Sequence, residues 1–305
     1  MTDPADRLVV TVDVECDSDG GPTWRNSAPL AFRNVPEGMA GVLLPILERT
    51  GSVATLLVSN VVLDHAPSVE ALGSLPRVEL GTHLHGDFLS PSPRCPDPTG
   101  LRPEDNQCDY TDDVERAKLE AITQLFESSF GSRPTSFRAG RWSAGGRTAR
   151  LLAELGYLVD SSVTPGMWWR DGGRSVDFRD APAQPYRPAS DDIACPGDLP
   201  IWELPVSIVP RWWLPQKPAW LRPSLTGFRE MRGVVRSIAR RHPAPRTFVA
   251  MLHSSELSVG TSPYSRDGTG AARVARRLEK LLRWAADEGI ESTTLTRAAK
   301  ACAAR

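Results

Sequence analysis

The sequence is poor in cysteine and has no paired-cysteine motif. It holds five cysteines in 305 residues, and no Cys-x-x-Cys pair occurs among them. An odd, scattered set argues against a disulfide framework and against a thiolate zinc site. The first seven residues also lack the basic segment that opens a secretory signal. We therefore expect a cytoplasmic protein whose fold depends on neither disulfides nor cysteine-bound metal.

Long apolar runs and an excess of one charge are also missing. No segment approaches the roughly 20 consecutive apolar residues that span a membrane. Lysine and arginine number 36 against 37 aspartate and glutamate, which gives a formal net charge of -1. This balance provides no overall electrostatic attraction to nucleic acid or to an anionic membrane. We expect a neutral or small substrate, no nucleic-acid partner and no membrane span.

Short apolar runs typical of strands alternate with amphipathic helical segments along the whole chain. The predicted strands cover residues 7–13, 53–58, 77–81, 135–138, 157–160, 201–206 and 247–253. The predicted helices cover residues 41–49, 65–72, 113–130, 147–155, 227–241 and 271–287. Such alternation indicates an α/β fold in which crossover helices join parallel strands. No repeat or linker interrupts it, so we expect one domain spanning residues 1–305.

Polar side chains of catalytic type stand at the ends of five predicted strands. They are Asp13, His83, Arg138, Asp160 and His253. In barrel-like α/β folds the active site lies at the C-terminal ends of the strands. These residues, distant in sequence, are therefore predicted to converge.

The first strand ends in alternating acids, Asp13-Val-Glu15. Alternation in an extended chain places both carboxylates on one side, where one can bind a metal while the other accepts a proton from water. The segment Thr82-His83-Leu-His85 likewise puts two imidazoles on one side of an extended chain. Two histidines and one carboxylate form a zinc site that keeps a position open for water.

Two further residue types suit the same chemistry. The guanidinium of Arg138 can hold a buried carboxylate in its ionised form. The imidazole of His253 can donate a proton to a departing amine. Their occurrence in one chain order with the acids and the histidine pair indicates a metal-dependent hydrolase.

In that order the motifs are Asp-Val-Glu, His-Leu-His, Phe-Arg-Ala-Gly-Arg, Val-Asp-Ser-Ser-Val and Leu-His-Ser-Ser-Glu-Leu. The set, which extends from Leu8 to Leu257, resembles the polysaccharide deacetylase superfamily (NodB homology domain, carbohydrate esterase family 4). With Ser262-Pro-Tyr264 it is similar to the deacetylase-like proteins of surface-polysaccharide gene clusters. The resemblance implies a distorted (β/α) barrel with seven strands. It also implies one divalent metal ion, Zn²⁺ in the first place and Ni²⁺ or Co²⁺ as alternatives.

The resemblance also implies the metal ligands, which would be Glu15, His83 and His85. The histidines of the family's second motif are usually four residues apart, and Asp87 stands four residues after His83. Asp87 is therefore an alternative to His85. The family's first motif has adjacent aspartates, so an exchange of roles, with Asp13 as ligand and Glu15 as base, is a second alternative.

The catalytic roles implied by the resemblance fall on four residues. Asp13 would be the general base, and Arg138 would orient it. His253 would be the general acid, and Asp160 would lie near His253 and raise its pKa. Metal-activated water would then remove an N-acyl group, above all N-acetyl, from a sugar or glycan precursor, as in polysaccharide biosynthesis.

Substrate contacts are predicted at Trp142, Glu256 and Tyr264, which lie within or just after these motifs. Further tryptophans in Pro-rich segments, Trp168-Trp169 and residues 212–220, could stack on sugar rings or could close the barrel. Two other functions remain open. One is hydrolysis of a linear or cyclic non-sugar amide on the same barrel. The other is carbohydrate binding by a catalytically silent homologue.

Overall fold

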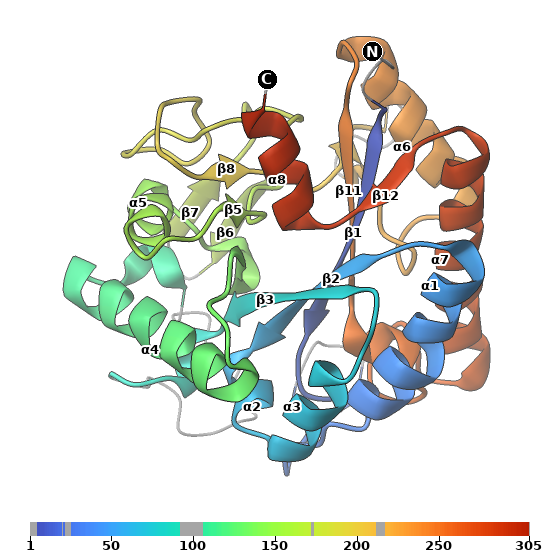
Figure 1. The fold of residues 1–305 in the computed structure, drawn as a ribbon, viewed down its shortest axis with the longest axis horizontal. Helices are drawn as coiled ribbons and strands as arrows, with labels where there is room; N and C mark the ends of the chain where they lie inside the picture. Colours follow the sequence, from blue (N-terminus) through green and yellow to red (C-terminus); the bar gives the residue numbers. More distant parts are fainter. Residues whose placement is uncertain are drawn as a thin grey trace.

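The computed structural model describes residues 5–19, 21, 26–91, 106–171, 174–211 and 217–304, without the side chains of Asp87, Asp171, Arg174 and Ser175. Its centre is a curled sheet with the strand order β11-β1-β2-β3-β4-β5-β8, in which β12 also pairs with β1 (Figure 1). Neighbouring strands are parallel throughout this sheet. The predicted distorted (β/α) barrel of seven parallel strands is thus confirmed.

The strands of this sheet are short. They are β1 (Arg7–Val14), β2 (Ala54–Ser59), β3 (Val78–Leu84), β4 (Ser136–Ala139), β5 (Val159–Asp160), β8 (Trp202–Glu203), β11 (Thr247–His253) and β12 (Glu291–Thr293). The strand predicted over residues 201–206 is reduced to two residues because Pro205 has no N–H to donate to a neighbour. Two small hairpins were not predicted: β6 (Trp168–Asp171) with β7 (Arg174–Asp177), and β9 (Ile208–Val209) with β10 (Ala219–Trp220).

Helices surround the sheet (Figure 1). They are α1 (Leu44–Thr50), α2 (Asn60–Leu63), α3 (Ala66–Gly73), α4 (Asp112–Phe130), α5 (Gly146–Glu154), α6 (Phe228–Arg241), α7 (Gly268–Asp287) and α8 (Leu295–Ala303). A π-helical segment, Val35–Leu43, leads directly into α1. No helix in the described ranges combines the length and the apolar character that a membrane crossing requires.

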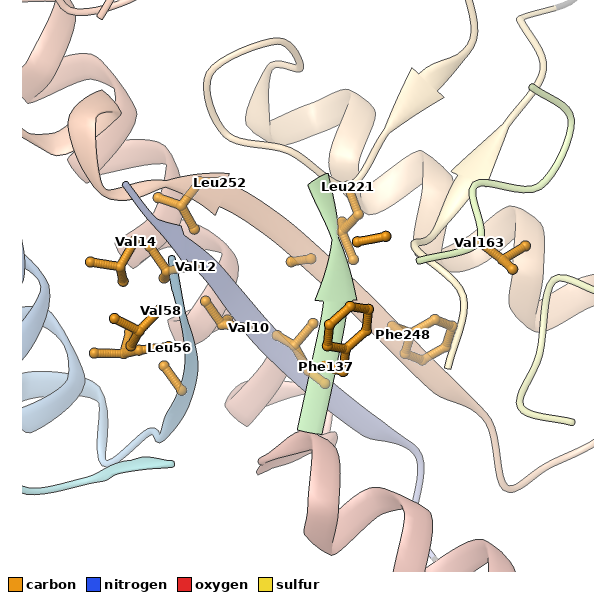
Figure 2. Close-up of a cluster of buried hydrophobic side chains, with 14 of the residues drawn as sticks. Val10, Val12, Val14, Leu56, Val58, Phe137, Val163, Leu221, Phe248 and Leu252 are labelled. Atoms are coloured by element: carbon orange, nitrogen blue, oxygen red, sulfur yellow. The ribbon is translucent and has the colours of Figure 1, made fainter. Parts of the chain in front are cut away.

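The side chains of β1 alternate between the core outside the barrel and the interior of the barrel. Val10, Val12 and Val14 point outward and pack with Leu56, Val58 and Leu252 in the layer between sheet and helices (Figure 2). The intervening residues point into the barrel and become more polar along the strand, from Val9 through Thr11 to Asp13. One face of the same strand thus packs in the core, and the other carries the polar side chains of Thr11 and Asp13 into the barrel.

Helix α8 closes the N-terminal end of the barrel. Its Leu295, Ala298 and Ala299 form a buried cluster with inward side chains of the strands, among them Val9 and Val249. The two ends of the strand order, β8 and β11, are bridged by irregular chain. Ser207, which follows β8, donates its N–H to the carbonyl oxygen of Val249 in β11 at 3.0 Å. Closure at these two places leaves the C-terminal ends of the strands as the open end of the barrel.

Candidate active site

A cavity of about 410 Å³ opens at the C-terminal ends of the strands. Its lining includes Asp13, Glu15, His83, His85 and His253, so strand ends distant in sequence do converge here. Three of the five histidines of the chain lie in this cavity.

Glu15, His83 and His85 bring their donor atoms together. Oε1 of Glu15 lies 3.0 Å from Nε2 of His83 and 3.1 Å from Nε2 of His85. The two Nε2 atoms are 3.1 Å apart, and the three ligand atoms all lie within 4.8 Å of one another. The side chain of Asp87, the alternative ligand, lies outside the described residues.

The chemistry of these donors fits a divalent metal. Nδ1 of His83 lies 3.0 Å from the carbonyl oxygen of Arg138, so Nδ1 carries a hydrogen, and in the neutral ring Nε2 is the nitrogen that offers a lone pair. Lone pairs on a carboxylate oxygen and on ring nitrogens repel one another unless a cation or a proton lies among them. A backbone carbonyl that orients a ligating imidazole is also the usual support of such ligands.

Gly140, in the turn after β4, permits the close approach of His85. A Cβ atom on Gly140 would lie 2.6 Å from Leu84 O and 3.0 Å from the His85 ring. Backbone and a packed ring cannot move aside cheaply, so this position requires glycine. The glycine of the Arg-Ala-Gly-Arg motif therefore serves the histidine pair.

Asp13 is held by Arg138. Nη1 of Arg138 donates to Asp13 Oδ1 at 2.7 Å, and both side chains are buried. Burial by itself raises the pKa of Asp13, but the positive charges of Arg138 and of the nearby imidazoles outweigh it, so this pKa lies below its ordinary value. The pKa of Glu15 is also well below its ordinary value, because His85, His253 and His83 together outweigh the effect of burial. Both acids are therefore ionised near neutral pH.

His253 faces both acids with one nitrogen. Its Nε2 lies 3.7 Å from Glu15 Oε1 and 4.0 Å from Asp13 Oδ2. Its Nδ1 lies 3.0 Å from Nη2 of Arg222 and 3.4 Å from Oε1 of Glu256. The imidazole is thus fixed between the proposed reacting groups and a supporting pair.

That supporting pair consists of Arg222 and Glu256, which form a hydrogen-bonded ion pair. Burial alone raises the pKa of Glu256, but Arg222 and His253 lower it to about 2. Glu256 was predicted to contact substrate, yet its side chain is buried behind His253. Arg222 was not predicted at all, because it follows β10, a two-residue strand without a clear pattern.

Asp160 was predicted to support His253, and its contacts are different. Its carboxylate accepts a hydrogen bond from Ser162 Oγ, and its Cα partner on the next strand is Glu203. Both acids are fully buried, and their Oδ2 and Oε2 atoms have no hydrogen-bond partner among the described groups. Burial raises the pKa of Asp160 to about 6, and burial with the negative charge of Asp160 raises that of Glu203 well above its ordinary value. The position beside His253 belongs to Glu256.

An aromatic wall, formed by Trp142, Trp169 and Trp220, borders the cavity. The ring centroids of Trp142 lie 6.5 Å from Trp169 and 5.9 Å from Trp220. Trp142 and Arg141 both have positive φ, of 56° and 53°, a conformation that costs energy for these side chains. Trp142, Trp169 and the predicted Tyr264 line the cavity.

Of the other predicted tryptophans, Trp168 is not among the residues that line the cavity. Trp168 is 37% exposed, and the guanidinium carbons of Arg170 and Arg179 lie 3.1 and 4.1 Å from its ring centroid. Trp212 and Trp213 fall outside the described residues. The possible sugar-stacking surface within the described ranges is therefore the aromatic wall.

The fold is similar to those of solved structures classed as polysaccharide deacetylases and related carbohydrate-active enzymes. A protein of Mycobacterium smegmatis classed as a polysaccharide deacetylase superposes with a TM-score of 0.60 at 18% identity, over 99% of this chain and 92% of its own. A protein of Parabacteroides distasonis classed as a glycoside hydrolase/deacetylase gives 0.63 at 11% identity, over 98% and 71%. A glycoside hydrolase family 57 branching enzyme from Thermococcus kodakaraensis gives 0.51 at 11% identity, over 96% and 70%. No family model and no curated protein matches the sequence.

Proposed function

We propose that this protein is a metal-dependent hydrolase that removes an N-acyl group, above all N-acetyl, from a sugar or glycan precursor. The observation that carries the proposal is the clustering of three metal-type donor atoms within 4.8 Å. A carboxylate held by a guanidinium and a supported imidazole lie in the same cavity. Such a set provides a ligand site, a base and an acid for amide hydrolysis.

Glu15, His83 and His85 would hold the metal, with Zn²⁺ as the first choice for two imidazoles and one carboxylate. When bound, the metal supplies Lewis acidity toward water and the substrate carbonyl. The contacts of the acids support this division of roles. Glu15 Oε1 faces both imidazoles, whereas Asp13 Oδ1 is taken by Arg138, which leaves Oδ2 to accept a proton.

Asp13 is the proposed base, and its low pKa keeps it ionised to accept a proton from the attacking water. His253 is the proposed acid, and its Nε2 gives a proton to the departing nitrogen. Glu256 takes the role that the sequence suggested for Asp160: Nδ1 accepts from Arg222 in the neutral ring, and in the protonated ring it can instead donate to the carboxylate of Glu256, to which Arg222 also donates. Free amine and carboxylate are the products.

The fold by itself does not choose this chemistry, since a branching enzyme shares it. Glycoside cleavage requires two carboxyl groups that flank the bond as acid and as nucleophile or base. In this cavity Glu15 is occupied by two imidazoles and Asp13 by Arg138. The donor set therefore favours metal-assisted amide hydrolysis over glycoside cleavage.

The aromatic wall supports a sugar substrate over a linear non-sugar amide. The apolar face of a pyranose ring can stack on Trp142 or Trp169, both of which line the cavity beside the donor atoms. Tyr264 lines the same cavity and adds a polar group. We infer that these three residues hold the sugar while its acetamido group faces Glu15 and His253.

Metal analysis and a deacetylase assay test the proposal together. The purified protein should retain about one equivalent of divalent metal and release acetate from N-acetyl amino sugars. His83→Ala should lose metal and turnover, whereas His65→Ala, which alters a histidine on the outer helix layer, should lose neither. Less than about half an equivalent of metal, with no turnover on adding Zn²⁺, Ni²⁺ or Co²⁺, would leave the carbohydrate-binding alternative.

A further inference from the structure

A second concave surface lies between α6 and α7, and its lining is strongly basic. The groove has a volume of about 480 Å³. Its cationic residues are Arg229, Arg273, Arg276, Arg277 and Lys280. The four residues on α7 follow the spacing i, i+3, i+4 and i+7, so they share one face of the helix.

These five cations have no carboxylate partner in the part of the chain that the structure describes. Glu230, the acid that lines the groove, is paired with Arg211. Burial and the like charge of Arg273 lower the pKa of Arg277. Like charges at i and i+4 destabilise a helix unless an anion compensates them.

The acid on α7 next to this row has other partners. Glu279, three residues after Arg276, forms ion pairs with Arg49 at 3.1 Å and with Arg283 at 2.8 Å. The cations that line the groove therefore keep no carboxylate partner among the described residues. Since the formal net charge of the whole chain is only -1, the row is a local feature and not a result of a basic composition.

We propose that the α6/α7 groove binds a phosphate or diphosphate group. Guanidinium groups donate paired hydrogen bonds to phosphate oxygens, and several cations around one concave surface match a compact dianion better than a carboxylate. The groove also adjoins the segment that carries Arg222, because Arg277 Nη1 donates to Pro223 O at 3.0 Å. Its ligand is thus held on a helix pair next to the segment that supports His253.

The test uses the full, metal-loaded protein and two probes. The first is ADP, whose binding is measured by titration calorimetry at about 0.1 M salt. The second is vesicles of phosphatidylglycerol, compared with phosphatidylcholine in a co-sedimentation assay, which reveals whether a lipid presents the phosphate. Any contact of ADP with the metal site is common to all variants, so differences between them report on the groove.

Arg273→Glu combined with Arg276→Glu should weaken binding of the successful probe at least about tenfold, the loss expected for one charge-assisted hydrogen bond or more. Both positions are exposed, so the fold should survive, and Lys280→Glu provides a second variant with a smaller effect. Arg297→Glu, at an exposed arginine of α8 outside the groove lining, is the matched control and should change binding less than about twofold. Failure of the wild type to bind either probe, or equal binding by the wild type and the double variant, would overturn the proposal. Deacetylase activity is not needed for any of these outcomes.

Discussion

The buried acids Asp160 and Glu203 allow a quantitative prediction about stability. They lie opposite each other on β5 and β8, both without exposed surface, and one carboxyl oxygen of each lacks a hydrogen-bond donor. A single proton shared between the two would satisfy both oxygens and remove the repulsion of two buried charges. Asp160→Asn replaces this arrangement with a neutral amide of the same shape, whose oxygen can still accept the hydrogen bond from Ser162.

The size of the effect follows from the pKa of Asp160. An elevation of this pKa from 3.8 to about 6 corresponds to ~3 kcal/mol in the free energy of unfolding. Because the folded pKa is the higher one, the stability from the protonated acid is fully present below about pH 4 and is lost as the pH rises through about 6. Compared with the wild type, Asp160→Asn should therefore gain ~3 kcal/mol between about pH 4 and pH 7.5.

Urea unfolding at both pH values, with metal present, measures this difference. Titration of the metal ligands affects wild type and variant alike and cancels in the comparison. Asp177→Asn is a control whose difference from the wild type should scarcely change over this pH range, because hydrogen bonding to Arg179 lowers the pKa of the exposed Asp177 to about 2 and its contribution is lost only below about pH 4. A stability difference between Asp160→Asn and wild type that stays constant over this pH range would refute the raised pKa of Asp160.

Three further predictions concern the active site. His253→Ala should keep the metal and lower kcat roughly 10²–10⁴-fold, the usual contribution of an acid catalyst, and normal turnover would exclude His253 as the acid. Trp169→Leu should raise KM about tenfold through loss of stacking, whereas the neighbouring Trp168→Leu, outside the cavity, should change KM less than about twofold. Gly140→Ala should weaken metal retention, measured by dialysis against a chelator, because its Cβ would lie 3.0 Å from the His85 ring, and unchanged retention would contradict this role.

The sequence predicts the sheet and most of the metal site because both depend on local alternation. Inward and outward residues of β1 differ in polarity, and the same alternation places Glu15 beside Asp13 at the end of the strand. Parallel pairing then brings His83 next to Arg138 in register, although they are 55 residues apart. The ends of β1, β3 and β11 meet at the cavity in this way, and Arg138 on β4 joins them through Asp13.

The elements that were missed have weak sequence signals for physical reasons. Helix α8 buries Leu295 with two alanines, so its apolar face carries little hydrophobic contrast. Strand β8 ends before Pro205, and β10 has only two residues, so neither shows the alternation of a longer strand. Arg222 depends on β10 for its place, and that is why a residue so close to His253 could not be predicted.

Asp160 and Glu256 are the two acids that could support His253, and their contacts in the structure distinguish them. Asp160 ends a strand in a motif of the right type, and sequence order alone makes it the partner of His253. Glu256 stands three residues after His253, in a turn whose path the sequence does not reveal, and its carboxylate lies 3.4 Å from Nδ1. Arg222 keeps that carboxylate ionised, with a pKa of about 2, while burial raises the pKa of Asp160 to about 6. Both acids are mainly ionised at neutral pH, so the contacts decide between them: Glu256 lies beside the imidazole, whereas Asp160 accepts a hydrogen bond from Ser162 and faces Glu203.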